Sequence, residues 1–343
     1  MLQLQNIRLF RPPLKRIVIG GVGGSIGLIG ILFGVAVYLV ESLTRPKRST
    51  PFDSYTFSPY ELGLPAEAIT FSPLSGDHKV KGWYIPDEKA TTTILVCPGY
   101  RSSMADVLGI SAHLWKAGHN VLVFEYHGHG SEVGAQVTLG YREINDFLGA
   151  VAYAKERAPH THIGVIAYSM GAAVAIMATA RNESVEAIVA DSAFATQWGV
   201  VDYNFRRAVR IPSAPFTWVA DYLLGWRAGY HFHQVEPLRE IARIVPRPIL
   251  IIHGDKDSIV DPRDATLLYN AAGEPKELWI GAGADHCGVY FQDRIAYVKK
   301  VTEFFDRYLK PSRSRLLLVE SSTEEQVRLQ DGRKGETDLS EAS

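Results

Sequence analysis

Short, continuously apolar segments alternate with helical patterns along most of this 343-residue sequence, and this alternation constrains the fold more than any other feature. Runs such as ILVC, VLVF, AIVA and ILII contain no polar residue, as expected of parallel strands buried on both faces. Strands alternating with helices predict an α/β fold with a mostly parallel, doubly wound sheet. The predicted strands are 68–71, 80–85, 92–97, 120–125, 163–167, 187–190, 249–252 and 277–280, and the predicted helices are 104–117, 141–157, 170–181, 262–272 and 293–309.

The alternation changes at three places. The first two strands are joined by the short segment PLSGDHK, which predicts an antiparallel hairpin at the sheet edge. Residues 196–247 are rich in aromatic side chains but contain no clear buried strand, so we expect a small helical cap inserted into one domain of residues 67–310. Residues 311–343 are mostly polar and predict a disordered tail.

Near the N-terminus, residues 17–40 include no charged side chain. As a helix this segment would be about 36 Å long, enough to cross the hydrocarbon core of a bilayer. A signal peptide is the alternative, but its apolar region is normally shorter and is followed by a small-residue cleavage site, whereas VESLTRPK follows here. We therefore predict a single-pass membrane anchor, preceded by a basic segment of residues 1–16 and followed by a linker of residues 41–66.

The flanks and glycines of this segment suggest its orientation and a partner. Four Lys and Arg residues precede it closely and three follow it, a bias that favours a cytoplasmic N-terminus and an extracytoplasmic catalytic domain. Small-xxx-small spacings allow close helix approach, so homodimerisation through a Gly-rich face is one hypothesis and a partnerless Gly-rich helix is the other. The glycines on that face are Gly20, Gly24, Gly27 and Gly34.

Composition excludes several classes of function. The 36 basic residues balance the 37 acidic ones, so we expect no nucleic-acid partner. Two cysteines, Cys97 and Cys287, exclude a disulfide-rich scaffold, and whether they pair is left open by the sequence. The histidine pairs 127/129 and 231/233 have no Cys, Asp or Glu at ligand spacing, so neither a metal nor an organic cofactor is expected.

The stretch IGVIAYSMGAAVAIMATA runs from a predicted buried strand through Ser169 directly into an Ala-rich helix. This is the setting of a nucleophile elbow, a turn so tight that the residues two before and two after the serine must be small. Ala167 and Gly171 meet that requirement. The short pattern alone is also satisfied by a serine that caps a helix. A catalytic serine is therefore indicated only if the sequence also supplies a base and an acid to act with it.

A hydroxyl nucleophile needs a base and a group that orients the base. The loop after ILII holds Asp257, and the loop after the last strand holds His286. Both loops leave the same sheet edge as Ser169, and the order Ser, Asp, His is that of one known triad class. The rival acids are Asp191, Asp255 and Asp261, while His253 is expected to pack or bond beneath the acid loop.

The developing oxyanion would need two backbone N–H donors. Met170 follows the nucleophile and supplies the first. Tyr100 follows a strand, next to Gly99, which lets the backbone turn in close, and supplies the second.

From about residue 58 to 310 the chain resembles the α/β-hydrolase superfamily, and is most similar to its bacterial serine aminopeptidase, acyl-CoA thioesterase and dienelactone hydrolase branch. The resemblance implies that Asp257 is the acid and His286 the base. Ala167 in the elbow and Cys97-Pro98, where many members have His-Gly, depart from the pattern without removing a catalytic group. The matching stretches include ILVCPGYRSS, VFEYHGHGSE, IGVIAYSMGAAVA, IVADSAFA, ILIIHGDKDSIVD and LWIGAGADH.

The sequence thus predicts a membrane-anchored serine hydrolase acting on a small acyl substrate, with Ser169, Asp257 and His286 as its triad. An esterase or lipase is expected first, because an anchor would hold the site near lipid. An aminopeptidase-like enzyme is the alternative, and acidic groups in the cap reading a free amino terminus would favour it: Asp202, Asp221, Glu236 and Glu240 are available. A non-catalytic scaffold on a hydrolase fold is the third interpretation.

Overall fold

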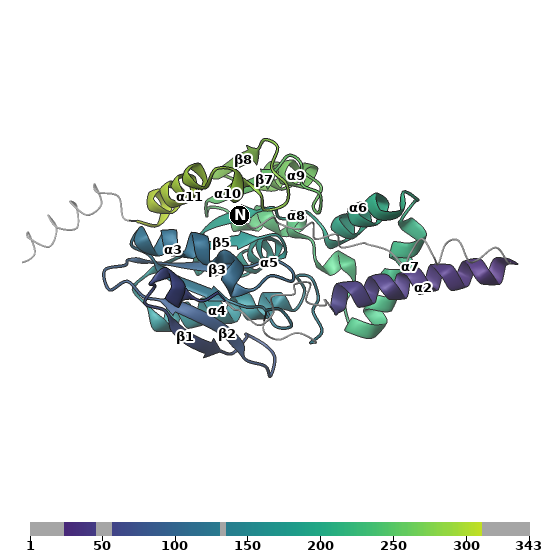
Figure 1. The fold of residues 1–343 in the computed structure, drawn as a ribbon, viewed down its shortest axis with the longest axis horizontal. Helices are drawn as coiled ribbons and strands as arrows, with labels where there is room; N and C mark the ends of the chain where they lie inside the picture. The colour runs from purple at the N-terminus through teal and green to yellow at the C-terminus, as the bar shows by residue number, and fades with distance from the viewer. Residues whose placement is uncertain (1–23, 46–56, 131–134, 311–343) are drawn as a thin grey trace, which may run out of the picture.

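The computed structural model describes residues 24–45, 57–130 and 135–310. One sheet of eight strands forms its centre, in the order β1-β2-β4-β3-β5-β6-β7-β8 (Figure 1). The first two strands are antiparallel at one edge, β2 pairs antiparallel with β4, and the remaining pairs are parallel. The strands are β1 Glu67–Phe71, β2 Val80–Ile85, β3 Thr92–Cys97, β4 Asn120–Phe124, β5 His162–Tyr168, β6 Val185–Asp191, β7 Ile249–Gly254 and β8 Lys276–Gly281. The predicted doubly wound sheet and its edge hairpin are confirmed.

Helices cover both faces of the sheet, and on each face an apolar cluster lies between the sheet and the helices. On one face lie α3 (Leu108–Lys116), α10 (Val289–Gln292) and α11 (Arg294–Leu309) (Figure 1). On the other lie α4 (Glu143–Arg157), α5 (Met170–Thr179) and α9 (Arg263–Ala271). Every residue of β3, β4 and β7 is buried, which is why these strands are continuous apolar runs in the sequence.

The cap follows β6 and is helical, as expected. Its two long helices are α6 (Gln197–Val209) and α7 (Ala214–Ala228), and the short helices η3 (Phe232–Gln234), α8 (Pro237–Glu240) and η4 (Ile241–Ile244) lead back to β7. The Thr196 hydroxyl begins α6 by accepting a hydrogen bond from the Gly199 N–H. Gly229, with a φ of 74°, ends α7 in the left-handed conformation that glycine adopts without strain.

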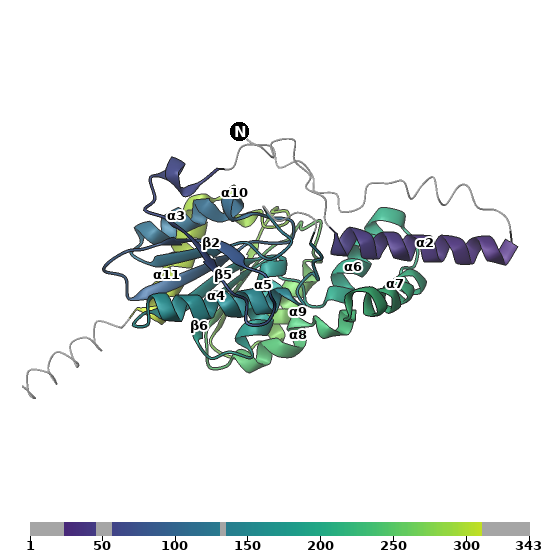
Figure 2. The ribbon, with the colours of Figure 1, turned by 90° about the horizontal axis from the view of Figure 1, so that it is seen from below.

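The N-terminal helix α2 (Gly24–Thr44) lies beside α7 and projects away from the sheet (Figures 1 and 2). It continues past Val40, where the predicted anchor ends, and Leu43 and Thr44 are buried. The first residues of the predicted linker are therefore helical and packed, because the last turn of α2 rests against the domain.

Four of the sequence predictions fall wholly or partly outside the described residues. These are the basic segment 1–16, the first part of the predicted anchor, 17–23, the middle of the predicted linker, 46–56, and the tail 311–343. Within the described ranges, no helix has both the length and the apolar character needed to cross a membrane.

Candidate active site

Ser169 lies in the sharp turn between β5 and α5, with a positive φ of 52°. A positive φ is costly for a residue other than glycine and persists where the surroundings enforce it. The close packing around this turn is seen at Gly171, where an added Cβ would lie 2.4 Å from the carbonyl oxygen of Pro98. The sequence requirement for a very small residue two positions after the serine therefore has a direct steric cause.

His286 connects the serine to a carboxylate. Its Nε2 lies 2.9 Å from Ser169 Oγ, and its Nδ1 lies 2.7 Å from Asp257 Oδ2. The three side chains come from the loops after β5, β7 and β8, which end at one edge of the sheet. The structure thus brings together the three residues singled out in the sequence, in the hydrogen-bonded relay that a triad requires.

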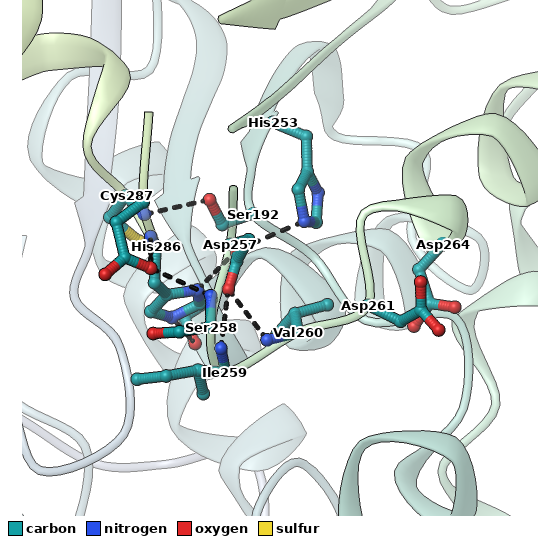
Figure 3. A network of polar contacts seen from close by, with 12 residues as sticks. Ser192, His253, Asp257, Ser258, Ile259, Val260, Asp261, Asp264, His286 and Cys287 are labelled. Carbon is teal, nitrogen blue, oxygen red and sulfur yellow. Dashed lines mark hydrogen bonds and ion pairs between the residues drawn. The ribbon is translucent and has the colours of Figure 1, made fainter. Parts of the chain in front are cut away.

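Asp257 is held from several directions (Figure 3). Its Oδ1 accepts hydrogen bonds from the backbone N–H groups of Ile259 and Val260, both at 2.8 Å. Its Oδ2 lies 3.1 Å from His253 Nε2 as well as next to His286. Burial alone would raise the pKa of Asp257, but the contacts with the two histidines outweigh it and hold the pKa well below its usual range. Asp257 is therefore ionised throughout the neutral range.

The other candidate carboxylates have partners other than the side chain of His286. Asp191 is fully buried and accepts hydrogen bonds from the Tyr297 and Ser192 hydroxyls, at 2.7 and 2.9 Å. Asp255 accepts from the Gly283 N–H, and Asp261 pairs with Arg263. Among the candidate carboxylates, Asp257 is the one in contact with the histidine.

Two further residues support the acid and histidine loops. His253 is fully buried and contacts the carboxylate oxygen that His286 also uses, in agreement with the expectation that it packs or bonds beneath the acid loop. Asp285 is exposed and accepts hydrogen bonds through Oδ1 from the N–H groups of Ser258 and His286, at 2.8 and 2.7 Å. These bonds tie the acid loop to the histidine loop. The adjacency of Asp285 to His286 was the one available signal in the sequence.

His286 is more basic than an ordinary histidine. Burial lowers the pKa of His286, but the hydrogen-bonded carboxylate of Asp257 opposes burial, and the pKa is raised above 6.5. Burial also raises the pKa of the Cys287 thiol, which is therefore uncharged at neutral pH. Asp257 is thus the anion that favours the imidazolium form. Cys287 and the buried Cys97 are both free thiols.

The loop that follows β3 lies directly against the nucleophile. An added Cβ on Gly99 would be 3.2 Å from Ser169 Cβ, a tight contact, so glycine favours this close approach of the backbone. Tyr100 is the next residue along this loop, and Met170 is the first residue of α5, whose N–H has no partner within the helix. Both predicted N–H donors therefore belong to segments that adjoin Ser169.

An apolar cavity of about 40 Å³ adjoins Ser169. One of its walls is Leu43, from the last turn of α2, a contribution that the sequence did not indicate. The same turn is fixed by the Tyr100 hydroxyl, which lies 2.9 Å from the carbonyl oxygens of both Ser42 and Leu43. The remaining lining residues are Tyr100, Leu139, Phe194, Val200, Val201, Asn204, Ile259 and Val260.

The family model described as "Prolyl oligopeptidase family" matches residues 111–312, more than half of the chain and the part that holds Ser169, Asp257 and His286. The chain belongs to the prolyl oligopeptidase family. Together with the likeness to solved hydrolase structures, this membership confirms the resemblance to the α/β-hydrolase superfamily and identifies the protein as a hydrolase by fold.

Among curated proteins, the Bacillus subtilis protein YqkD is 28% identical over 297 residues, covering 84% of this chain and 96% of YqkD. The Escherichia coli K12 protein YfhR is 25% identical, covering 83% and 95% of the two chains. Among solved structures, the Pyrococcus furiosus esterase Pf2001 superposes with a TM-score of 0.63 at 25% identity, covering 78% of this chain and 98% of the esterase. The Anabaena variabilis dienelactone hydrolase gives a TM-score of 0.51 at 19% identity, covering 72% and 99%, and supports the shared fold.

Proposed function

We propose that this protein is a serine hydrolase that cleaves an ester or related acyl bond through an acyl-enzyme intermediate. The observation that carries the proposal is the position of His286, within hydrogen-bond distance of both Ser169 Oγ and Asp257 Oδ2. A serine hydroxyl is a weak nucleophile unless such a base is in contact with it.

In the proposed reaction, Ser169 Oγ attacks the substrate carbonyl carbon while its proton passes to His286 Nε2. The N–H groups of Tyr100 and Met170 stabilise the oxyanion, and His286 then gives the proton to the leaving group. Water, deprotonated by His286, attacks the acyl-enzyme and releases the acid, with the proton returning to Ser169. Asp257 holds the imidazole in the tautomer that carries its proton on Nδ1.

An apolar ester fits the site better than a peptide with a free amino terminus. The lining residues that the structure describes include no acidic side chain. The acidic groups of the cap are engaged by other partners: Asp202 by Arg206 and Ser213, Asp221 by His231, Glu236 by Arg239, and Glu240 by Arg243. The similarity to the esterase Pf2001 also favours an ester. Peptidase activity is the second candidate, favoured by the description of the family.

Membrane anchoring through residues 17–40 is part of the proposal. It is supported by the uncharged sequence of this segment and by α2, which carries the second part of it away from the sheet (Figure 2). The four basic residues before the segment, against three after it, support an extracytoplasmic domain. Gly30 and Gly34 have open space beside their Cα atoms, which is compatible with the proposed homodimer.

A substrate panel tests the proposed reaction. The full chain is assayed with p-nitrophenyl esters of increasing acyl length, an acyl thioester and aminoacyl p-nitroanilides, alongside labelling by a fluorophosphonate probe. We expect labelling and ester hydrolysis. Faster cleavage of the aminoacyl amides would replace the esterase by the peptidase, and a chain that neither labels nor hydrolyses any of these compounds would be the non-catalytic scaffold.

The raised pKa of His286 sets the expected pH dependence. The base must be neutral to take the serine proton, so activity is lost as the pH falls through the pKa of His286 and gained as it rises. We expect the acidic limb of kcat/KM for a p-nitrophenyl ester to lie above pH 6.5, the ordinary histidine value. A profile measured from about pH 5 to about pH 9 checks this. A limb at or below 6.5 would contradict the proposed influence of Asp257.

The Tyr100 hydroxyl is proposed to position the oxyanion loop through α2. Tyr100→Phe removes the donor to two carbonyl groups at the end of α2, leaving them unpaired at a cost of about 1–3 kcal/mol. We expect kcat to fall roughly tenfold while KM changes by no more than about twofold. The reason is that the lost hydroxyl positions the backbone N–H of residue 100, which donates to the oxyanion in the transition state. Tyr60→Phe, at an exposed side chain outside the pocket, is the control. A rise in KM with unchanged kcat would assign Tyr100 to substrate binding instead.

A further inference from the structure

A row of aromatic side chains lies exposed on α7. Trp218, Tyr222 and Trp226 are four residues apart, so they share one helix face, and their exposed fractions are 69, 72 and 80%. The opposite face of α7 buries Ala220 and Leu224 completely. Side chains of this size normally bury most of their surface in a soluble domain, so this aromatic row is a face with an outside partner.

The aromatic row belongs to the helix that accompanies α2. The two helices pack side by side, and an ion pair between Arg227 and Glu41 joins the end of α7 to the last turns of α2. Figures 1 and 2 both show the beginning of α2 projecting beyond α7, away from the sheet. That projecting end leads into residues 17–23, and the sequence from Ile17 to Val40 is uncharged throughout. The row therefore lies next to the segment proposed to enter a bilayer.

The chemistry of the row is that of a bilayer surface. Tryptophan and tyrosine combine a large apolar ring with an N–H or O–H group, and they concentrate where hydrocarbon meets headgroups. The end of α6 also exposes Arg207 and Arg210, which anionic headgroups attract. Phe33 of α2 is half exposed as well. An apolar face with polar ring atoms, on a cap that also exposes arginines, fits lipid better than the dry core of a protein interface.

We infer that Trp218, Tyr222 and Trp226 seat the cap in the headgroup region of a lipid bilayer, alongside the membrane entry of α2. This inference rests on the proposed anchoring through residues 17–40. Because Leu43 of α2 also lines the pocket beside Ser169, the seating holds the acyl pocket close to the membrane surface. The substrate class that fits this arrangement is an acyl ester that partitions into lipid.

The test uses the tryptophans as depth reporters. The full chain is reconstituted into liposomes of phosphatidylcholine and phosphatidylglycerol with brominated acyl chains, which quench nearby indole fluorescence. We expect quenching of the wild type, and expect Trp218→Phe/Trp226→Phe to remove more than about half of it, since these rings lie at the interface. The matched control is Trp83→Phe/Trp279→Phe, whose rings belong to β2 and β8 and whose removal should leave the quenching in place.

Flotation of the same liposomes, followed by carbonate extraction, reports on the anchor separately. If the chain floats and resists extraction but the wild type and Trp218→Phe/Trp226→Phe are quenched equally, the anchor stands and the aromatic row does not contact lipid. A chain that does not float overturns both ideas. If quenching is absent while Trp218→Cys forms a disulfide-linked dimer in the liposomes, a second copy of the chain covers the row and the inference fails.

Discussion

Replacing Ser169 with alanine is expected to lower kcat for a p-nitrophenyl ester by roughly 10⁵- to 10⁶-fold. The substitution removes Oγ, which lies 2.9 Å from His286 Nε2, so the base has no hydroxyl to deprotonate and no acyl-enzyme can form. The activity left over water would come from the Tyr100 and Met170 N–H groups. Labelling by a fluorophosphonate should disappear, because that probe reports the activated serine directly.

The fold should survive this substitution. Alanine has a Cβ like serine, so the positive φ of 52° costs about the same in both. Ser184→Ala is the control, because Ser184 lies in the turn between α5 and β6, outside the pocket. The Ser184 hydroxyl accepts a hydrogen bond from Lys155 of α4. The control should keep full labelling and full rate. Labelling that persists in Ser169→Ala with an intact circular dichroism spectrum would mean that another serine is the nucleophile.

The sheet was predictable because its central strands are apolar on both faces. For β3 the predicted and observed bounds agree, at residues 92–97. β6 was predicted too short, as 187–190, whereas it begins at Val185. The missing start includes Glu186, a polar residue near the strand end whose carboxylate faces the exposed His162. Polar residues at strand ends interrupt the apolar pattern although the backbone pairing continues.

The position of α2 was not predictable from its sequence. An apolar helix satisfies its side chains equally well in lipid or against another helix, and both environments demand the same residue types. Leu43 follows Glu41 and precedes a basic stretch, which made it part of a predicted linker. Only the packing of α2 on α7 and on Tyr100 brings Leu43 to the pocket.

The candidate site was also predictable only in part. Ser169, Asp257 and His286 were predicted because each follows a recognisable strand, and the ends of parallel strands meet at one edge of the sheet. The contact of His253 with Asp257 was expected, because His253 lies just before the acid loop. The bonds of Asp285 to two backbone N–H groups were not, because they depend on how the acid and histidine loops fold over one another. Loop geometry of this kind carries no periodic signal in a sequence.

Asp257→Asn is expected to lower kcat by roughly 10⁴-fold while leaving the acid loop in place. The asparagine oxygen can keep both hydrogen bonds from Ile259 and Val260, because they fix the orientation of the side chain. The amide NH₂ then faces His286 Nδ1 and donates to it. His286 is forced to carry its proton on Nε2, next to Ser169, and can no longer accept the serine proton.

Asp255→Asn and Asp261→Asn are the matched controls, since both lie on the same loop and contact partners other than His286. Their rates should stay within about threefold of the wild type, as for substitutions outside the relay. The decisive comparison is with Asp191→Asn, the buried rival near the site. If that variant lost the activity and Asp257→Asn kept more than about a tenth of it, the orienting carboxylate would be Asp191, and the hydrogen bond from His286 to Asp257 would be structural.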